Sequence, residues 1–193
     1  MGSLILRASF FLVIIIFAAT SVLADTGRLI EQMKTGGHIL MIRHALAPGN
    51  GDPAEFKIGD CSTQRNLDDR GRAQARSIGA WLRSRGIVKA RVFSSQWCRC
   101  LDTANLINMG PVTPLPALNS FYDRPQDREP NLKHLRLFLS KQKSHDELLI
   151  LVTHFVTISA ISGEALSSGE GVVLRMEEKG AYEFVGKLDF DYR

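Results

Sequence analysis

The sequence has no internal repeat, no low-complexity tract and no glycine-rich phosphate-binding loop of the Walker type. Aromatic residues are scarce, at 8%, and the 24 basic residues are nearly balanced by 20 acidic ones, without a basic tail or a basic patch interleaved with aromatic residues. Histidines, cysteines and carboxylates are not grouped at the spacings of a zinc site. These absences exclude repeat architectures and P-loop chemistry, and they predict a protein with no nucleic-acid partner and no metal or other cofactor.

The overall composition is that of a folded protein. The chain has 193 residues, of which 45% are hydrophobic and 23% are charged, close to the averages of globular proteins. This length supports one domain with a core of its own and is short for two.

The first 24 residues have the organisation of a signal peptide. Arg7 supplies a positive charge, an uncharged apolar run extends over residues 10–19, and Val22 and Ala24 are the small residues that a signal peptidase requires. We therefore expect cleavage between Ala24 and Asp25.

An uncleaved membrane anchor over residues 4–23 is the alternative interpretation, which the interrupting Arg7 disfavours. In both cases we expect export, to the periplasm or the medium, of a domain formed by residues 25–193, with membrane contact only through an uncleaved anchor. Removal of the segment leaves 23 basic and 20 acidic residues, a small positive charge that suits either a solvated surface or a site for a small anion.

Three cysteines are present, Cys61, Cys98 and Cys100. An exported protein meets an oxidising environment, in which one disulfide and one free thiol can persist. Cys98 and Cys100 are two residues apart on an expected helix, so they point to different faces and pair poorly with each other. Any disulfide therefore includes Cys61, and three buried thiols remain the alternative.

Strands and helices alternate along the chain, and the chain ends in a hairpin. This order predicts a three-layer α/β/α sandwich with a mostly parallel central sheet. The expected strands are residues 38–42, 90–94 and 147–153, a short edge strand within residues 111–116, and a hairpin of residues 172–177 and 182–188; the expected helices are residues 26–34, 66–85, 96–107 with Ser95 as its cap, 131–143 and 155–161.

Two long loops interrupt this pattern. Residues 45–65 are so rich in glycine and proline that we expect no regular structure there, and residues 119–130 form a second polar loop. Loops of such length inside a compact domain are commonly functional or mobile. The first of them begins directly after His44.

Reactive or cationic side chains follow three of the expected strands. Arg43 and His44 end the first strand, Arg99 lies in the first turn of the helix after the second, and His154 ends the third. Ligands of open α/β sheets bind outside the carboxyl ends of the strands, so these residues should meet at one edge. The backbone amides at the start of the helix with Arg99 should help to hold an anion.

The charges of this cluster predict phosphate chemistry. Guanidinium groups match phosphate oxygens as forked donors, and no carboxylate within these segments neutralises them. Nearby cations lower the pKa of an imidazole, which keeps His44 neutral and able to attack phosphorus. We expect a phosphohistidine on His44, with Arg43, Arg99 and His154 stabilising charge on the transferring oxygens.

Three motifs in this order resemble those of the histidine phosphatase superfamily, whose fold is phosphoglycerate mutase-like. With the helix start at residues 67–75, the resemblance covers residues 39 to about 161. The resemblance implies a cofactor-free phosphatase for a small phosphorylated substrate. It also implies that His44 accepts the phosphoryl group and that Arg43, Arg99 and His154 bind its oxygens. The motifs are Arg43-His44-Ala45, where the family usually has glycine third, residues 94–104 with Arg99 as the phosphate-binding arginine, and Val152-Thr153-His154.

The family resemblance also suggests a general acid that protonates the leaving oxygen. Many relatives carry this carboxylate shortly after a leucine, in the loop that corresponds to residues 119–130 here. Asp123 is the nearest carboxylate in that position, and Asp127 and Glu129 follow it. A solvated loop aspartate is the competing interpretation. A non-catalytic phosphate-binding or envelope interaction module, with the same cavity and no acid, is therefore the alternative function.

Finer details follow from the same resemblance. Relatives tend to pair a loop cysteine with the residue before the phosphate-binding arginine, which implies a Cys61–Cys98 disulfide. The short exported branch of the family includes enzymes that remove phosphate from heptose phosphates of the lipopolysaccharide core. An envelope sugar phosphate is accordingly the expected substrate.

Overall fold

The computed structural model describes residues 26–143 and 146–190. The expected signal peptide, residues 1–24, lies outside the described residues. Within the described part of the chain, no helix is long and apolar enough to cross a membrane. Residues 26–34 are helical, as expected, and lead into the first strand.

A six-stranded mixed sheet forms the centre of the molecule, in the order β3-β2-β4-β1-β5-β6. The four strands from β3 to β1 are parallel, whereas β5 and β6 form the expected antiparallel hairpin beside β1. The strands are β1 (His38–Arg43), β2 (Arg91–Ser94), β3 (Val112–Pro114), β4 (Leu149–Thr153), β5 (Gly171–Met176) and β6 (Tyr182–Leu188).

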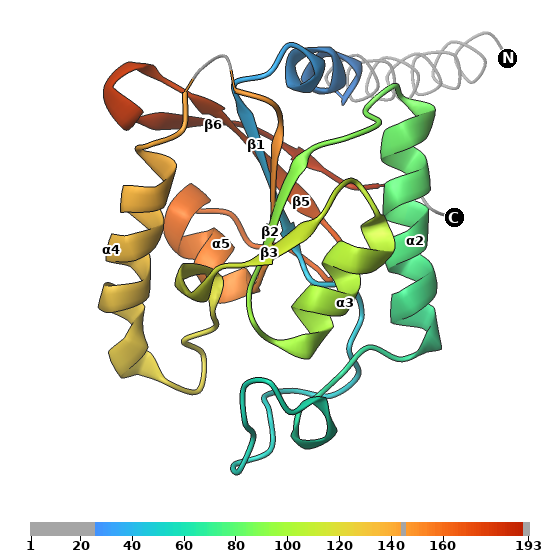
Figure 1. The fold of residues 1–193 in the computed structure, drawn as a ribbon, viewed down its shortest axis with the longest axis vertical. Helices are drawn as coiled ribbons and strands as arrows, with labels where there is room; N and C mark the ends of the chain where they lie inside the picture. Colours follow the sequence, from blue (N-terminus) through green and yellow to red (C-terminus); the bar gives the residue numbers. More distant parts are fainter. Residues whose placement is uncertain (1–25, 144–145, 191–193) are drawn as a thin grey trace, which may run out of the picture.

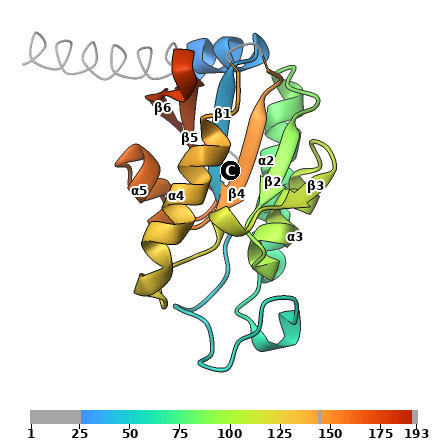
Figure 2. The same ribbon diagram turned by 60° about the vertical axis from the view of Figure 1, so that its left-hand side comes forward.

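Helices cover both faces of this sheet, which confirms the three-layer α/β/α architecture (Figures 1 and 2). Leu40 and Ile42 of β1 pack toward α2 (Asp69–Ser84) and α3 (Cys98–Ile107). Ile39 and Met41 pack toward α4 (Arg128–Leu139) and α5 (Phe155–Ser162). Alternate residues of a strand point to opposite faces, so a continuous apolar run is what a strand buried on both sides needs.

The register of the parallel strands brings their carboxyl ends level. Arg43 of β1 pairs with Thr153 of β4, and Ser94 of β2 pairs with Val152. The long loop of residues 45–65 extends beyond this same edge of the sheet (Figure 1). Residues that follow β1, β2 and β4 therefore start from one place.

Three local expectations were wrong. Helix α3 begins at Cys98 with Trp97 as its N-cap, so Ser95 is not the cap. Helix α4 begins at Arg128 and ends at Leu139, and it accommodates Pro130 because the first amides of a helix have no intrahelical acceptor. The loop of residues 45–65 contains a 3₁₀ helix, Cys61–Thr63, whose cap Asp60 accepts a hydrogen bond from the Ser62 amide.

A disulfide joins Cys61 to Cys98, as the family resemblance implied, with the two Cα atoms 5.7 Å apart. Cys100 is buried and carries a free thiol. The bridge links the long loop to the first residue of α3. The loop is therefore tied covalently to the helix that carries Arg99.

Loss of this bridge should destabilise the fold. The two cysteines are 37 residues apart, and closing a loop of that size in the unfolded chain is worth about 4 kcal/mol. We expect Cys61→Ser to lower the free energy of unfolding by about that amount in urea titrations. Reduction of the unmodified protein should reproduce the loss, whereas Cys61→Ser itself should not respond to reductant. Equal stability of the oxidised and reduced protein would contradict this role.

Candidate active site

One cavity of about 220 Å³ lies at the carboxyl edge of the parallel strands. It brings together Arg43, His44, Arg99, His154 and Asp123, all five of the site residues expected from the sequence. Its remaining lining comes from the long loop and from the segments after β3, β4 and α5: Leu46, Ala47, Pro48, Gly49, Asn50, Gly51, Arg65, Ser120, Tyr122, Phe155 and Ser168.

His44 is held with one ring nitrogen free for reaction. Its Nδ1 lies 2.8 Å from the carbonyl oxygen of Ala45, which can only accept, so Nδ1 carries the proton and Nε2 the lone pair. The residue is 3% exposed. Burial, followed by the charge of Arg99, lowers the pKa of His44 to about 3. A neutral, oriented imidazole results, as nucleophilic attack requires.

Acidification should therefore leave His44 neutral far below the pH at which a free imidazole gains its proton. We expect the ring signals of His44 in NMR spectra to keep their neutral-form shifts from pH 8 to pH 5. The pKa of His44 falls from 6.5 in the unfolded chain to about 3 in the folded protein, so only the unfolded chain gains a proton between these values. The contribution of His44 to the free energy of unfolding is therefore fully present above pH 6.5 and decreases as the pH falls below it. Exposed His134 on α4 serves as the reference signal. Protonation of His44 near pH 6.5 would contradict the environment described here.

His154 lies across the cavity from His44, with the two ring centroids 5.5 Å apart. Its Nε2 is 2.9 Å from the hydroxyl of Ser95, which itself donates to Asn119. Nε2 therefore carries the proton, and Nδ1 faces Nη2 of Arg99 at 3.5 Å. Burial, together with the proximity of His44, lowers the pKa of His154 well below 6.5. Ser95 thus orients the second histidine.

Two buried arginine nitrogens in the cavity have no hydrogen-bond partner. They are Nε of Arg43 and Nε of Arg99. Arg43 donates from Nη1 to the carbonyl of Leu166 at 2.7 Å, and its guanidinium lies 5.3 Å from the centre of the Phe155 ring. Buried donors are nearly always paired, so two unpaired ones beside a nucleophile indicate the place of an anion.

Asp52, from the long loop, is a partner of Arg99 that the sequence analysis missed. Its carboxylate accepts from Nη1 and Nη2 of Arg99 at 2.8 and 3.0 Å, and both side chains are almost fully buried, at 3% and 4% exposed. It also accepts from Nε1 of Trp97 and from the amide of Arg65, both at 3.0 Å. Burial alone would raise the pKa of Asp52, but the hydrogen bonds and charge of Arg99 outweigh it and lower the pKa.

This ion pair fixes which edge of Arg99 is available. The end of the guanidinium, Nη1 and Nη2, is taken by Asp52, and Nη1 also donates to the Arg65 carbonyl at 3.2 Å. On the side of the guanidinium, Nη2 faces Nδ1 of His154, and only Nε remains for another acceptor. The motif segments contain no carboxylate that neutralises the arginines, but Asp52 from the long loop does neutralise Arg99. Asp52 thus orients Arg99 while leaving its Nε without a partner.

Arg65 is a third arginine of the cavity, and the sequence analysis did not identify it. Its Nε donates to the carbonyl of Gly51 at 2.7 Å, and its Nη1 donates to the carbonyl of Ala47. These bonds place its charge close enough to lower the pKa of both His44 and His154. The loop of residues 45–65 has no hydrophobic period that would mark Arg65 as pointing inward.

Three amides around the start of α3 donate to side chains and not to the cavity. The amide of Gln96 donates to the side chain of Asn119, that of Trp97 to Ser95, and that of Cys98 to Gln64. Side chains thus occupy these three donors, and the unpaired arginine nitrogens are the clearer candidates for binding an anion.

Asp123 lies at the exposed rim of the cavity, beside Gly51 of the long loop. Asp127 and Glu129, the other two carboxylates considered for this role, do not line the cavity. Asp127 ends a 3₁₀ helix, and Glu129 lies in the first turn of α4. Asp123 therefore stays the candidate acid. In the described part of the chain, no group of three or more histidine, cysteine or acidic side chains is placed to hold a metal ion.

Comparisons with known families and structures show what this chain is similar to. Residues 39–122 match the model of the histidine phosphatase superfamily, branch 1. The protein histidine phosphatase SixA complexed with tungstate superposes with a TM-score of 0.56 at 16% identity, covering 79% of this chain and 97% of that one. The alpha-ribazole phosphatase from Shigella flexneri gives 0.55 at 14% identity, covering 76% and 94%.

A curated relative is similar over part of its length. The mitochondrial serine/threonine-protein phosphatase Pgam5 of Drosophila virilis is 35% identical over 74 residues, which are 38% of this chain. The aligned part is only 23% of that relative's own length.

Proposed function

We infer that this chain belongs to the histidine phosphatase superfamily and hydrolyses phosphate monoesters through a phosphohistidine intermediate on His44. One observation carries the proposal: a neutral imidazole with a free Nε2 faces a cavity in which two buried arginine nitrogens lack partners. Such a cavity suits a phosphoryl group in both charge and donor geometry.

The first step forms a bond between Nε2 of His44 and phosphorus as the ester P–O bond breaks. The Nδ1 proton, held by the Ala45 carbonyl, lets the ring carry the positive charge that develops on it. Nε of Arg43 and of Arg99 donate to the equatorial oxygens, where charge accumulates in the transition state. Asp123 gives its proton to the departing alkoxide.

The second step returns the enzyme to its starting state. Water attacks phosphorus, the Asp123 carboxylate takes a proton from that water, and the N–P bond breaks to release inorganic phosphate. Protonation of His154 at Nδ1, favoured once an anion lies beside it, would supply a further donor to the phosphoryl oxygens.

Purified protein and an aryl phosphate provide the direct test. An aryl phosphate has a good leaving group, so turnover depends on the nucleophile and the cations more than on the acid. We expect hydrolysis without added metal, with inorganic phosphate as a competitive inhibitor. Binding of phosphate without any turnover would contradict the proposal and favour the alternative of a non-catalytic phosphate-binding module.

Asp123→Asn should separate leaving-group protonation from attack. We expect kcat/KM for an alkyl phosphate to fall about 10²-fold or more, because the poor leaving group needs the acid, and kcat/KM for an aryl phosphate to change little. Steady-state kinetics with both esters measure this contrast. Asp127→Asn, a matched change outside the cavity, should affect neither substrate. An equal loss with both esters would remove Asp123 from the role of acid.

We further propose an exported location and an envelope sugar phosphate as substrate. The Cys61–Cys98 disulfide supports export, because such bonds persist in oxidising compartments. The apolar segment at residues 10–19 supports it independently. Fractionation of cells that produce the full chain would test the location, and loss of phosphate from envelope extracts would test the substrate.

A further inference from the structure

Phe155 is a large apolar residue that lies outside the core. It is the first residue of α5, directly after His154, and it is 38% exposed. It belongs to none of the three hydrophobic clusters found among the described residues. A single exposed apolar residue is ordinary on a protein surface. The position of Phe155 is informative because of what its ring contacts.

The ring of Phe155 contacts a phosphate-binding arginine and a second aromatic ring. The guanidinium carbon of Arg43 lies over the ring, 5.3 Å from its centre, which is within the range of a cation–π contact. Tyr122 packs against the same ring edge to face, with the centroids 5.6 Å apart. The Tyr122 hydroxyl accepts a hydrogen bond from Nδ2 of Asn50 at 3.4 Å. Tyr122 therefore restrains the ring over which Arg43 lies.

Arg43 is held differently from Arg99. Its Nη1 donates to the carbonyl of Leu166, in the loop after α5, at 2.7 Å, and its Nε has no partner. Burial lowers the pKa of Arg43, and the charge of Glu170 opposes this effect without forming an ion pair among the described residues. Arg99, in contrast, has both Nη atoms bound by the Asp52 carboxylate. A carbonyl and an aromatic ring thus do for Arg43 what a carboxylate does for Arg99.

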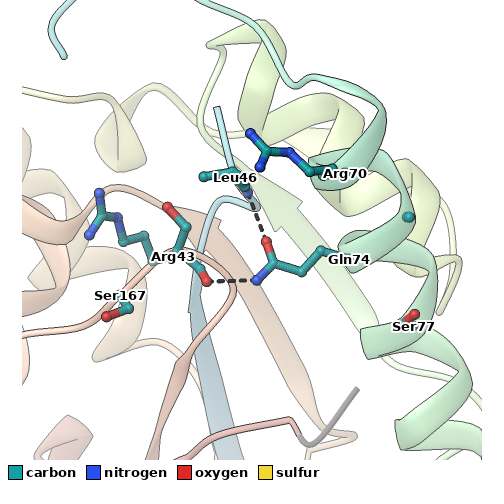
Figure 3. A pocket seen from close by; sticks show the side chains of 8 residues that line it. Arg43, Leu46, Arg70, Gln74, Ser77 and Ser167 are labelled. Atoms are coloured by element: carbon teal, nitrogen blue, oxygen red, sulfur yellow. Dashed lines mark hydrogen bonds between the residues drawn. The ribbon is translucent and has the colours of Figure 1, made fainter. Parts of the chain in front are cut away.

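Helix α2 does not hold the guanidinium of Arg43. Arg43 also lines a second cavity, of about 670 Å³, which Arg70 and Gln74 of α2 line from the other side. The Arg43 side chain points away from both of these residues (Figure 3). Gln74 accepts from the Leu46 amide at 2.8 Å and donates to the Ser168 carbonyl at 2.9 Å. The restraints on the guanidinium therefore come from α5 and the loop that follows it.

We propose that Phe155 is a positioning residue, whose ring holds the Arg43 guanidinium so that its Nε is directed at the phosphoryl group. The inference rests on the proposed phosphatase function and adds a residue that acts through Arg43. An aromatic ring attracts a cation without carrying a negative charge, so Arg43 keeps its full charge for the substrate. A carboxylate partner would offset part of that charge. Small displacements of a group beside the reacting atoms are costly in rate, which makes such a restraint valuable.

Removal of the ring tests this role. We expect Phe155→Leu to lower kcat/KM about tenfold for aryl and alkyl phosphates alike, and to raise the inhibition constant of inorganic phosphate about fivefold. Inorganic phosphate has no leaving group, so its inhibition constant reports on the phosphoryl site alone. Phe155→Tyr keeps the ring and should stay within about twofold of the unmodified protein in both quantities. Phe184→Leu, the same change at an equally exposed position on β6, is the matched control and should alter neither.

A double variant shows whether the ring acts through Arg43. In an Arg43→Lys background, Phe155→Leu should lower kcat/KM for an aryl phosphate by less than about twofold, because the guanidinium that the ring holds is absent. Thermal melts of all variants should match those of their parents, since Phe155 lies outside the hydrophobic clusters.

The outcomes separate this inference from the proposed function. A loss confined to aryl esters, with an unchanged inhibition constant of phosphate, would overturn it, because the ring would then contact the leaving group. An equal loss in the Arg43→Lys background would overturn it as well. Both results leave the phosphatase function in place. If the unmodified protein hydrolysed no ester, that function would fall, and calorimetric phosphate affinities of the same variants would still decide the role of Phe155.

Discussion

His44→Ala should abolish phosphatase activity while the protein stays folded. The expected loss in kcat/KM for an aryl phosphate is on the order of 10⁴-fold or more, because the variant loses the covalent intermediate and not merely one contact. The removed imidazole makes a single hydrogen bond, to the carbonyl of the next residue, so the structural cost should be modest. Steady-state rates and a thermal melt of the same samples measure both quantities.

The labelling behaviour of this variant gives a second readout. Brief exposure of the unmodified protein to a ³²P-labelled phosphate ester should leave an acid-labile, base-stable label, as expected for a phosphohistidine, and His44→Ala should carry none. His134→Ala makes the same chemical change at an exposed position on α4 and should retain full labelling. A label of equal strength in His44→Ala would show that another residue accepts the phosphoryl group.

Asp52→Asn should lower kcat/KM for an aryl phosphate about 10²-fold, although Asp52 lines neither cavity. The asparagine has the same shape, but it removes the negative charge and turns an NH₂ group toward the guanidinium of Arg99. Arg99 then loses the carboxylate that accepts from its Nη1 and Nη2 and so holds the guanidinium in place. The inhibition constant of inorganic phosphate should rise in parallel, as it would not for a purely structural change.

Stability measurements complete the case for Asp52. Asp52→Ala leaves a buried guanidinium without its counter-charge, and we expect the free energy of unfolding to fall by about 3 kcal/mol. Because the folded protein lowers the pKa of Asp52 below 3.8, this contribution is fully present above that value and is lost as the pH falls through the lowered pKa. Glu55→Gln, an exposed change in the same loop, is the control. Unchanged phosphate affinity in Asp52→Asn would exclude a positioning role.

The sequence could predict the residues whose place is set by regular structure. Arg43, His44 and His154 lie at strand ends, and the parallel register that brings those ends together follows from the alternation of strands and helices. Arg99 lies at the second residue of a helix that itself follows a strand. Periodicity locates such positions because each has a fixed offset from a buried element.

Asp52 and Arg65 could not be located in this way. Both lie in the loop of residues 45–65, which has no hydrophobic period, so nothing in the local sequence shows which side chain turns inward. Their contacts depend on the ring of Trp97 and on carbonyls of the same loop. The predicted start of α3 was wrong for a related reason. Ser95 and Gln96 form hydrogen bonds with His154 and Asn119, which are distant in the sequence, and Ser95 does not cap the helix.

The buried thiol of Cys100 is not poised to attack the disulfide two residues before it. Exchange between a thiol and a disulfide needs the thiolate form of the attacking sulfur. Burial raises the pKa of Cys100 to about 12, despite the opposing charge of Arg99, so almost no thiolate exists at neutral pH. An odd third cysteine therefore does not scramble the pairing of the folded protein, and the position of the loop with Asp52 is kept by a cross-link that cannot exchange internally.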